Sequence, residues 1–220
     1  MNTVLTESND TFVWGLTRNS NFTVKFMYND LMQTDRILGN CIGWKLKVPL
    51  KIKISMWYFR KGVLLTKDNL AKRNWKEENK CYFCDKNETI QHLFFDYHVA
   101  KFAWNAVFVT FRIQPPASVS HLLGSWLGVF SLKLRKQMLV GVAELCWVLW
   151  LNRNDAVFNR KLPKSYLQVF FRGTYWTRFW LQLSKEEEKD LLKNVCRQLE
   201  GRVLELFARR GWNFRNRLAC

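Results

Sequence analysis

The sequence predicts a mainly α-helical protein that begins with a β-hairpin and carries one small unit rich in cysteine and histidine. Three observations support this fold class. Hydrophobic residues make up 48% and aromatic residues 15% of the 220 residues, enough apolar material for a packed core. Apolar runs with helical spacing dominate the chain after residue 43. Short β-favouring runs occur near the N-terminus.

The first 43 residues are expected to form a region of their own. Residues 12–14 and 22–24 favour strands and flank a stretch rich in turn formers, which predicts a hairpin. Residues 26–32 are predicted to be helical, and the glycines of 35–43 break the chain. We therefore place the domains at 1–43, 44–112 and 113–220.

A helix is predicted after Pro49, whose ring suits a first helical turn because it lacks an N–H group. This helix would turn five apolar side chains inward: Ile52, Ile54, Met56, Trp57 and Phe59. The alternation of lysine and isoleucine at 51–54 would suit a strand equally well. Thr66 is predicted to cap a short helix at 67–73 with its side-chain oxygen.

Three helices are predicted after the proline-containing break at 114–118. The first, 136–151, holds an apolar run that includes Glu144 and is shorter than the roughly 20 residues that span a bilayer, so we interpret it as buried. Pro163 precedes the second, 166–183, whose aromatic residues we assign to the core: Phe170, Phe171, Tyr175, Trp176, Phe179 and Trp180. The third begins at the acidic residues 186–188 and ends near Arg209, which suits the helix dipole.

The chain is strongly basic, with 35 lysines and arginines against 18 acidic residues and a net charge of +17. This surplus favours a polyanionic partner, although a solvated basic surface without a partner would have the same composition. The six cysteines lack a disulfide-like spacing, and the N-terminus lacks a secretory signal. We expect reduced thiols in the nucleus or cytoplasm, with no secretion and no membrane partner.

One group of residues has the spacing of a metal site. Two residues separate Cys81 from Cys84, and seven residues separate Cys84 from His92. Five residues separate His92 from His98. Two thiolates and two imidazoles form a tetrahedral ligand set for Zn²⁺, so the pattern predicts a zinc-knuckle-like unit. The alternative is two unrelated thiols in a turn and a histidine on an apolar helix face. The gap is shorter than the roughly twelve residues of a DNA-reading finger, so no major-groove helix is implied.

Several short sequence segments surround this cysteine–histidine pattern. They are WKLKVPLKIK at 44–53, MW at 56–57, LTKDNL at 65–70, CYFC at 81–84, ETIQHLF at 88–94 and Trp104. Together they resemble the zinc-binding domain of plant reverse transcriptases, which lies downstream of the polymerase in non-LTR, LINE-type retrotransposons. A looser resemblance extends over FVW at 12–14, CWVLW at 146–150, RND at 153–155 and FRGTYW at 171–176.

The resemblance implies that Cys81, Cys84 and His92 bind zinc and that a cysteine stands five residues after His92. Tyr97 occupies that position, and a phenol is a poor zinc ligand at neutral pH because its pKa lies near 10. We predict that His98 supplies the fourth ligand. Two alternatives stay open: three protein ligands with a water molecule, or loss of the metal.

Basic and aromatic residues before the motif predict binding to nucleic acid. Lysine and arginine side chains can neutralise phosphates, and exposed aromatic rings can stack on unpaired bases. We assign Trp57 and Phe59 to the core and Trp75 to stacking. No spacing specifies base readout, so we expect largely sequence-independent binding of RNA or single-stranded DNA. The predicted binding residues are Lys45, Lys47, Lys51, Lys53, Arg60, Lys61, Lys72, Arg73 and Trp75.

No catalytic residue is predicted. Two-metal phosphoryl transfer needs clustered carboxylates, and we interpret the acidic run at 186–188 as a helix start. Glu88 is the only general-base candidate near the motif. The sequence thus predicts a zinc-stabilised nucleic-acid-associated module without polymerase activity, the detached C-terminal part of a retrotransposon reverse transcriptase. The alternative is a non-functional or protein-interaction remnant with a decayed zinc site.

Overall fold

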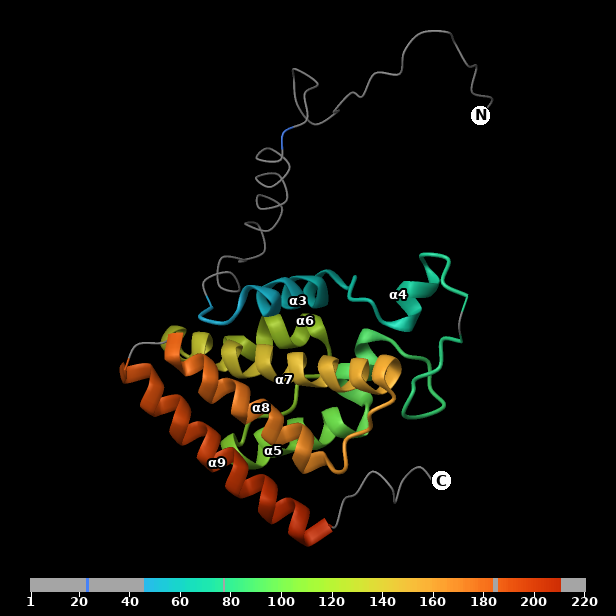
Figure 1. Ribbon diagram of the computed structural model, residues 1–220. Coiled ribbons are helices and arrows are strands. Elements are labelled where there is room, and N and C mark those ends of the chain that lie inside the picture. The colour runs from blue at the N-terminus through green and yellow to red at the C-terminus, as the bar shows by residue number, and fades with distance from the viewer. Residues whose placement is uncertain (1–22, 24–45, 77, 184–185, 211–220) are drawn as a thin grey trace. The chain divides into compact units, whose positions relative to one another are not determined.

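A computed structural model of the protein describes Thr23 and residues 46–210, apart from 77, 184 and 185 (Figure 1). The described helices all lie in one unit of the chain, Gly43–Cys220. The hairpin predicted at 12–24 falls outside the described residues, Thr23 excepted, and so do the helix predicted at 26–32 and Lys45.

The described part of the chain is mainly helical, which confirms the helical part of the predicted fold class. It contains no strand, only an isolated antiparallel bridge between Lys80 and Asn87. Two short segments, η1 and η2, are π-helical, and η3 is a 3₁₀ turn. The elements are α3 (Leu50–Lys61), α4 (Lys67–Ala71), η1 (His92–Asp96), α5 (His98–Phe111), α6 (Val119–His121), η2 (Leu122–Trp126), α7 (Leu132–Asn159), α8 (Tyr166–Trp180), η3 (Leu181–Leu183) and α9 (Glu186–Arg210).

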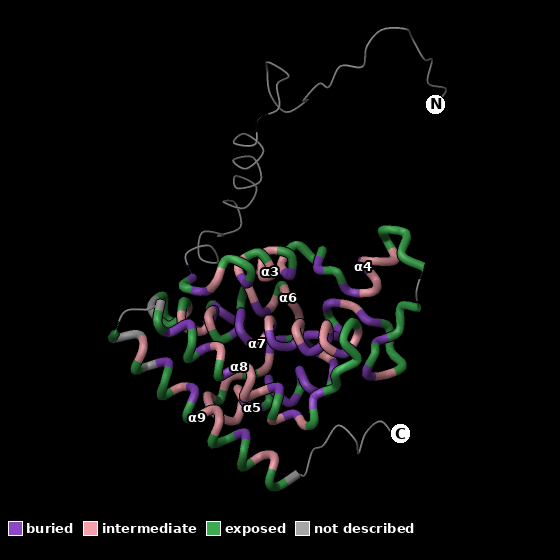
Figure 2. The backbone as a smooth tube through the Cα atoms, viewed as in Figure 1, coloured by how far each residue is buried: buried purple, intermediate pink, exposed green. Residues whose placement is uncertain are grey.

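The long helix α7 lies at the centre of this unit. It packs against α8, α3, α5 and η1, while α8 and α5 both contact α9 (Figure 1). Buried residues follow α7 and the neighbouring sides of α5 and α8, whereas much of α9 is exposed (Figure 2). The predicted buried helix at 136–151 is therefore confirmed as the core of the fold. No helix among the described residues is long and apolar enough to cross a membrane.

The helix predicted after Pro49 is confirmed as α3, with Pro49 as its N-cap. It ends at Gly62, whose φ of 69° is left-handed and whose N–H group donates to the carbonyl of Phe59. Ile52 and Phe59 are buried, but Ile54 is 37% exposed, so its predicted inward position is wrong. Residues seven apart share a helix face, whereas a residue two positions from Ile52 points away from that face.

Thr66 precedes α4 as predicted, but its side chain does not cap the helix. Its hydroxyl donates instead to the carboxylate of Asp68 and to the carbonyl of Leu64. The free N–H group of Lys67 is satisfied by the carboxylate of Glu88, at 3.0 Å. The cap therefore comes from a residue 21 positions away, which local spacing could not predict.

The two C-terminal helices agree closely with the prediction, but not every aromatic side chain of α8 is in the core. Trp180 is buried, whereas Tyr175 and Phe179 are 61% and 51% exposed. These two residues are four apart, so they share the outer face of the helix. Assigning both of them to the core was wrong.

A buried ion pair joins α7 to the segment before η1. The Oε1 atom of Glu88 accepts hydrogen bonds from Nε and Nη2 of Arg153, at 3.0 and 2.7 Å. Both side chains are almost fully excluded from solvent. The Arg153 guanidinium also lies 5.1 Å from the centroid of the Trp150 ring. Because a buried charge without a partner is costly, each residue depends on the other.

We expect Arg153→Ala to lower the free energy of unfolding by about 3–5 kcal/mol, because it leaves the Glu88 carboxylate buried without its partner. The double variant Glu88→Leu/Arg153→Met should lose less, since it removes both charges together. Urea denaturation measures both values. Arg172→Ala is the control: its pair with Asp155 is about one-third exposed, so its loss should cost no more than about 1 kcal/mol. If Arg153→Ala and Arg172→Ala lowered the free energy of unfolding equally, the Glu88–Arg153 pair would not be a buried ion pair of the kind described.

Glu144 is a second buried acidic residue, in the middle of α7. Burial raises its pKa well above the ordinary value of 4.5, opposed by a backbone hydrogen bond from Thr177 and by the charge of Arg178. Gly173 of α8 lies against it, since a Cβ atom there would stand 3.2 Å from Oε1 of Glu144. The glycine thus lets α8 approach the carboxyl group closely.

This raised pKa predicts a pH dependence of stability. Above about pH 4.5 the unfolded carboxyl group ionises while the folded one keeps its proton, so the free energy of unfolding falls as pH rises. The slope is about 1.4 kcal/mol per pH unit for this one group. Glu144→Gln lacks the titration, so its stability relative to the native chain should increase from pH 4.5 towards pH 7, as measured by urea melts. A difference that stays constant with pH would refute this.

Candidate metal centre

The two cysteines of the motif lie in a short loop that closes on itself. The N–H group of Cys81 donates to the carbonyl of Lys86 at 2.8 Å, beside the bridge between Lys80 and Asn87. The N–H group of Glu88 then donates to the carbonyl of Asn79, also at 2.8 Å. These bonds hold Cys81 and Cys84 on one tight turn.

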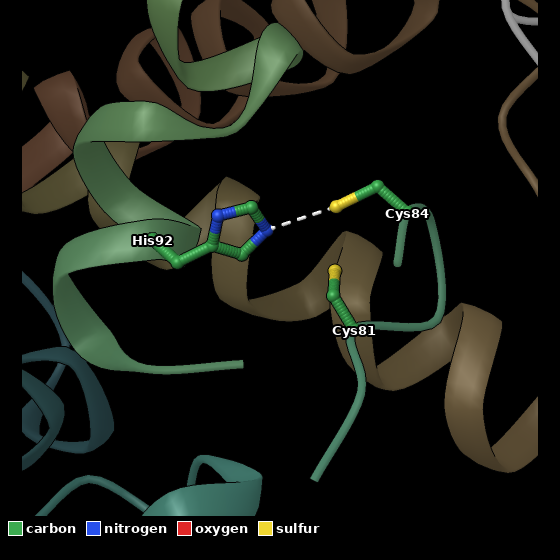
Figure 3. A group of neighbouring side chains, drawn as sticks. All are labelled: Cys81, Cys84 and His92. Carbon is green, nitrogen blue, oxygen red and sulfur yellow. Dashed lines mark hydrogen bonds between the residues drawn. The ribbon is translucent and has the colours of Figure 1, made fainter. Parts of the chain in front are cut away.

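The histidine of the motif comes from the adjacent π-helical segment. His92 is the first residue of η1, and its N–H group donates to the hydroxyl of Thr89 at 3.0 Å. Its Nε2 atom lies 3.2 Å from Sγ of Cys84, with Cys81 beside them (Figure 3). The ligand atoms of Cys81, Cys84 and His92 all lie within 4.8 Å of one another.

This arrangement fits a zinc ion. With Zn–S near 2.3 Å and Zn–N near 2.0 Å, tetrahedral ligand atoms stand about 3.5 to 3.8 Å apart. The three atoms are grouped closely enough to reach that geometry with small side-chain movements. Cys81 and His92 are buried, and neither cysteine is in a disulfide. Two thiols and an imidazole form the donor set that zinc prefers.

Burial sets the protonation of the candidate ligands in the absence of a metal. Burial lowers the pKa of His92 and so favours the neutral ring, which is the form that binds metals. Burial also raises the pKa of the Cys81 thiol to about 12, with smaller contributions from Cys84 and Glu88, against a backbone hydrogen bond from Phe83. A metal ion would reverse this preference, because its charge stabilises the thiolate.

The junction between η1 and α5 determines which residue faces the fourth position. Tyr97 has an extended backbone, with φ −64° and ψ 145°, and begins α5 as its N-cap. Its side chain is buried, whereas that of the next residue, His98, is exposed. His98 is not part of the group formed by Cys81, Cys84 and His92. The structure therefore brings together three of the four predicted ligands.

Tyr97 packs its ring against Phe83 of the cysteine loop. The ring stacks on Phe83, with centroids 4.9 Å apart, and lies 6.1 Å from the His92 ring. Its hydroxyl group is buried and has no hydrogen-bond partner among the described residues. Burial raises the pKa of Tyr97, and Cys81, Tyr166 and Cys84 raise it further. A buried phenol thus stands at the position where the resemblance expects a cysteine.

The predicted nucleic-acid-binding residues have different surroundings. Trp75 is 49% exposed, and Lys47, Lys61, Lys72 and Arg73 are exposed as well, while Lys53 and Arg60 are partly buried. Lys51 is exposed, but its Nζ atom lies 5.7 Å from the centroid of the Trp147 ring and 5.9 Å from that of Trp176. A cation–π interaction of this kind holds Lys51 against α7 and α8.

Two residues that matter for the site were not assigned this role from the sequence. From the sequence, Glu88 is a general-base candidate, and Arg153 is named only within the segment 153–155 that loosely resembles the reverse transcriptase zinc-binding family. Their ion pair supports the segment between Cys84 and His92. The signal in the sequence was an arginine just after the apolar run of a helix predicted to be buried. If helix packing buries such a residue, it requires an anionic partner.

The fold and this site define a helical domain with a group of two cysteines and one histidine that could hold a metal ion. Residues 22–104 match the family model described as zinc-binding in reverse transcriptase. The matched segment contains Cys81, Cys84 and His92 and ends at Trp104. No curated protein and no solved structure matches the chain.

We expect His98→Ala to bind zinc with nearly native affinity, because His98 is exposed and lies outside the group. Tyr97→Cys should bind zinc about tenfold more tightly or better, because a third thiolate completes the tetrahedron. Competition against a chromophoric chelator measures both affinities, and mass spectrometry gives the zinc content. Cys81→Ala is the control that removes a ligand. Loss of zinc in His98→Ala would instead assign His98 as the fourth ligand.

Proposed function

We propose that this chain is a zinc-stabilised, basic nucleic-acid-associated module, the C-terminal part of a reverse transcriptase from a plant non-LTR, LINE-type retrotransposon. The observation that carries the proposal is the group of Cys81, Cys84 and His92 within the segment that matches the family model. Zinc held by these residues would supply a structural cross-link between the cysteine loop and η1.

The surface beside this centre supports a polyanionic ligand. After α4 the chain turns at Asn74, whose φ is 64°, and the N–H group of Trp75 donates to the carbonyl of Leu70 at 3.1 Å. Trp75 is thereby left on the surface between exposed basic residues, Lys72, Arg73 and Lys76. An exposed indole among cations can stack on an unpaired base while the cations bind phosphates.

The predicted basic residues in α3 that are described would add to the positive charge of the chain: Lys51, Lys53, Arg60 and Lys61. Lys51 would contribute less, because its ammonium group already lies over two indole rings. Backbone phosphates carry no sequence information, so the proposed binding is to RNA or single-stranded DNA with little sequence preference.

We also propose that the chain has no polymerase activity of its own. The group that could hold a metal among the described residues contains two thiols and an imidazole, and no carboxylate. The ligands for two-metal phosphoryl transfer are carboxylates. The expected result of a primer-extension assay with Mg²⁺ is no product, and product formation would contradict this part of the proposal.

The binding test uses charge reversal. We expect Lys72→Glu/Arg73→Glu/Lys76→Glu to weaken binding of a fluorescein-labelled single-stranded RNA at least about tenfold at low salt, because three cations that neutralise phosphates are removed. The slope of log affinity against log salt should flatten by about 0.7 for each phosphate that is no longer neutralised. Fluorescence anisotropy measures both, with DNA of the same sequence in parallel.

Lys101→Glu/Lys161→Glu/Lys164→Glu is the matched control. These three lysines are also exposed, so the variant changes the net charge equally but lies elsewhere on the chain. Equal losses of affinity for the two triple variants would indicate general electrostatic attraction, and the proposed surface would be wrong. Trp75→Ala should lower affinity by about 1–3 kcal/mol while leaving the salt slope unchanged.

The second candidate function is a remnant that folds and carries no nucleic-acid role, and Tyr97 is the observation that favours it. A buried phenol at the expected ligand position is compatible with a decayed metal site. Purified protein without zinc, together with no salt-dependent RNA binding, would favour the remnant. One zinc per chain would favour the module.

A further inference from the structure

A cavity of about 390 Å³ lies among α5, α7, α8 and α9. Its walls are mainly apolar and include Trp104, Val148 and Tyr166. The volume is within the range of about 300–1,000 Å³ that is typical of small-molecule sites. The cavity is separate from the metal centre, because none of Cys81, Cys84 and His92 lines it.

Two of the polar side chains that line this mainly apolar cavity come from α7, and each has a buried oxygen without a partner among the residues that the structure describes. Oε1 of Glu144 is buried and has no hydrogen-bond partner within the described part of the chain, and the same holds for Oε1 of Gln137. Glu144 as a whole is only 6% exposed. A buried polar atom without a partner costs free energy, so a molecule that supplies a hydrogen bond there gains from it.

The chemistry of the carboxyl group indicates the kind of molecule. A hydroxyl group can donate a hydrogen bond to a carboxyl oxygen and can also accept one from a protonated carboxyl group. It therefore pairs with Glu144 in either protonation state. Most of the remaining lining residues are apolar and favour apolar or aromatic groups. The other polar side chains of the lining belong to Tyr166, Thr174, Thr177 and Gln198.

We propose that this cavity binds a small, largely apolar molecule that carries one hydroxyl group, with the hydroxyl on Glu144. This inference is independent of the metal centre and of nucleic-acid binding. A ligand would enter the cavity between α7 and α9, where three lining residues are also exposed: Leu134, Gly141 and Gln198.

The test uses two probes that differ by one hydroxyl group, para-trifluoromethylphenol and trifluoromethylbenzene. Fluorine NMR of the full chain measures both dissociation constants. The phenol should bind about tenfold more tightly, because it makes one more hydrogen bond. In Glu144→Leu the ratio of the two dissociation constants should fall to near one. Circular dichroism and thermal melting check that this variant is folded.

A second variant tests the location. Gly141 lines the cavity, and a Cβ atom there meets nothing within 4 Å, so Gly141→Trp should be tolerated and should obstruct the cavity. It should weaken both probes at least about tenfold. Gly201→Trp on α9 is the control: its Cβ position is equally open, and it does not line the cavity. Absence of saturable binding, a ratio unchanged by Glu144→Leu, or equal effects of the two tryptophan variants would overturn the proposal.

Discussion

The pairing of Glu88 with Arg153 is the interaction on which the rest of the described structure depends. A fully buried carboxylate is tolerated only when hydrogen bonds and an opposite charge replace water. Its Oε1 atom receives Arg153 from α7 and the N–H group of Lys67 at the start of α4. The backbone of Glu88 is bonded as well, to Asp68 and to Asn79. One residue thereby joins α4, the cysteine loop and the central helix.

This arrangement also explains how a short loop can present metal ligands from a mainly helical protein. Glu88 lies between Cys84 and His92, so holding its position also positions the ligands on either side. The backbone of the loop is ordered by one isolated bridge, and the Phe83 ring of the loop stacks on Tyr97. The ion pair joins this segment to α7, and a bound metal ion would add a link between the loop and η1.

The junction between η1 and α5 decides which side chain stands where a fourth metal ligand is expected. Residues 97 and 98 meet where η1 ends and α5 begins, and neighbouring side chains at such a junction point in different directions. Tyr97 therefore lies with the cysteines and the stacked ring of Phe83, whereas His98 faces solvent. The side chain of His98 therefore does not occupy the position that a side chain at residue 97 occupies, although the two residues are neighbours in the sequence. Spacing alone treats the two positions as nearly equivalent, which is why it favoured His98.

The sequence by itself determined the helices α7, α8 and α9, because apolar periodicity, prolines and acidic helix starts act locally. For α3 it left a strand as an equal alternative. It also determined that Cys81, Cys84 and His92 group together, since two cysteines on one turn and a histidine on the next segment need few long-range interactions. Only the tertiary structure decided that Glu88 pairs with Arg153, 65 residues away, and caps α4 in place of Thr66. It alone decided that Ile54, Tyr175 and Phe179 face outward and that Lys51 rests on two indoles. The physical reason is that periodicity shows that a helix has an apolar face, whereas the packing of other helices decides which side chains are covered.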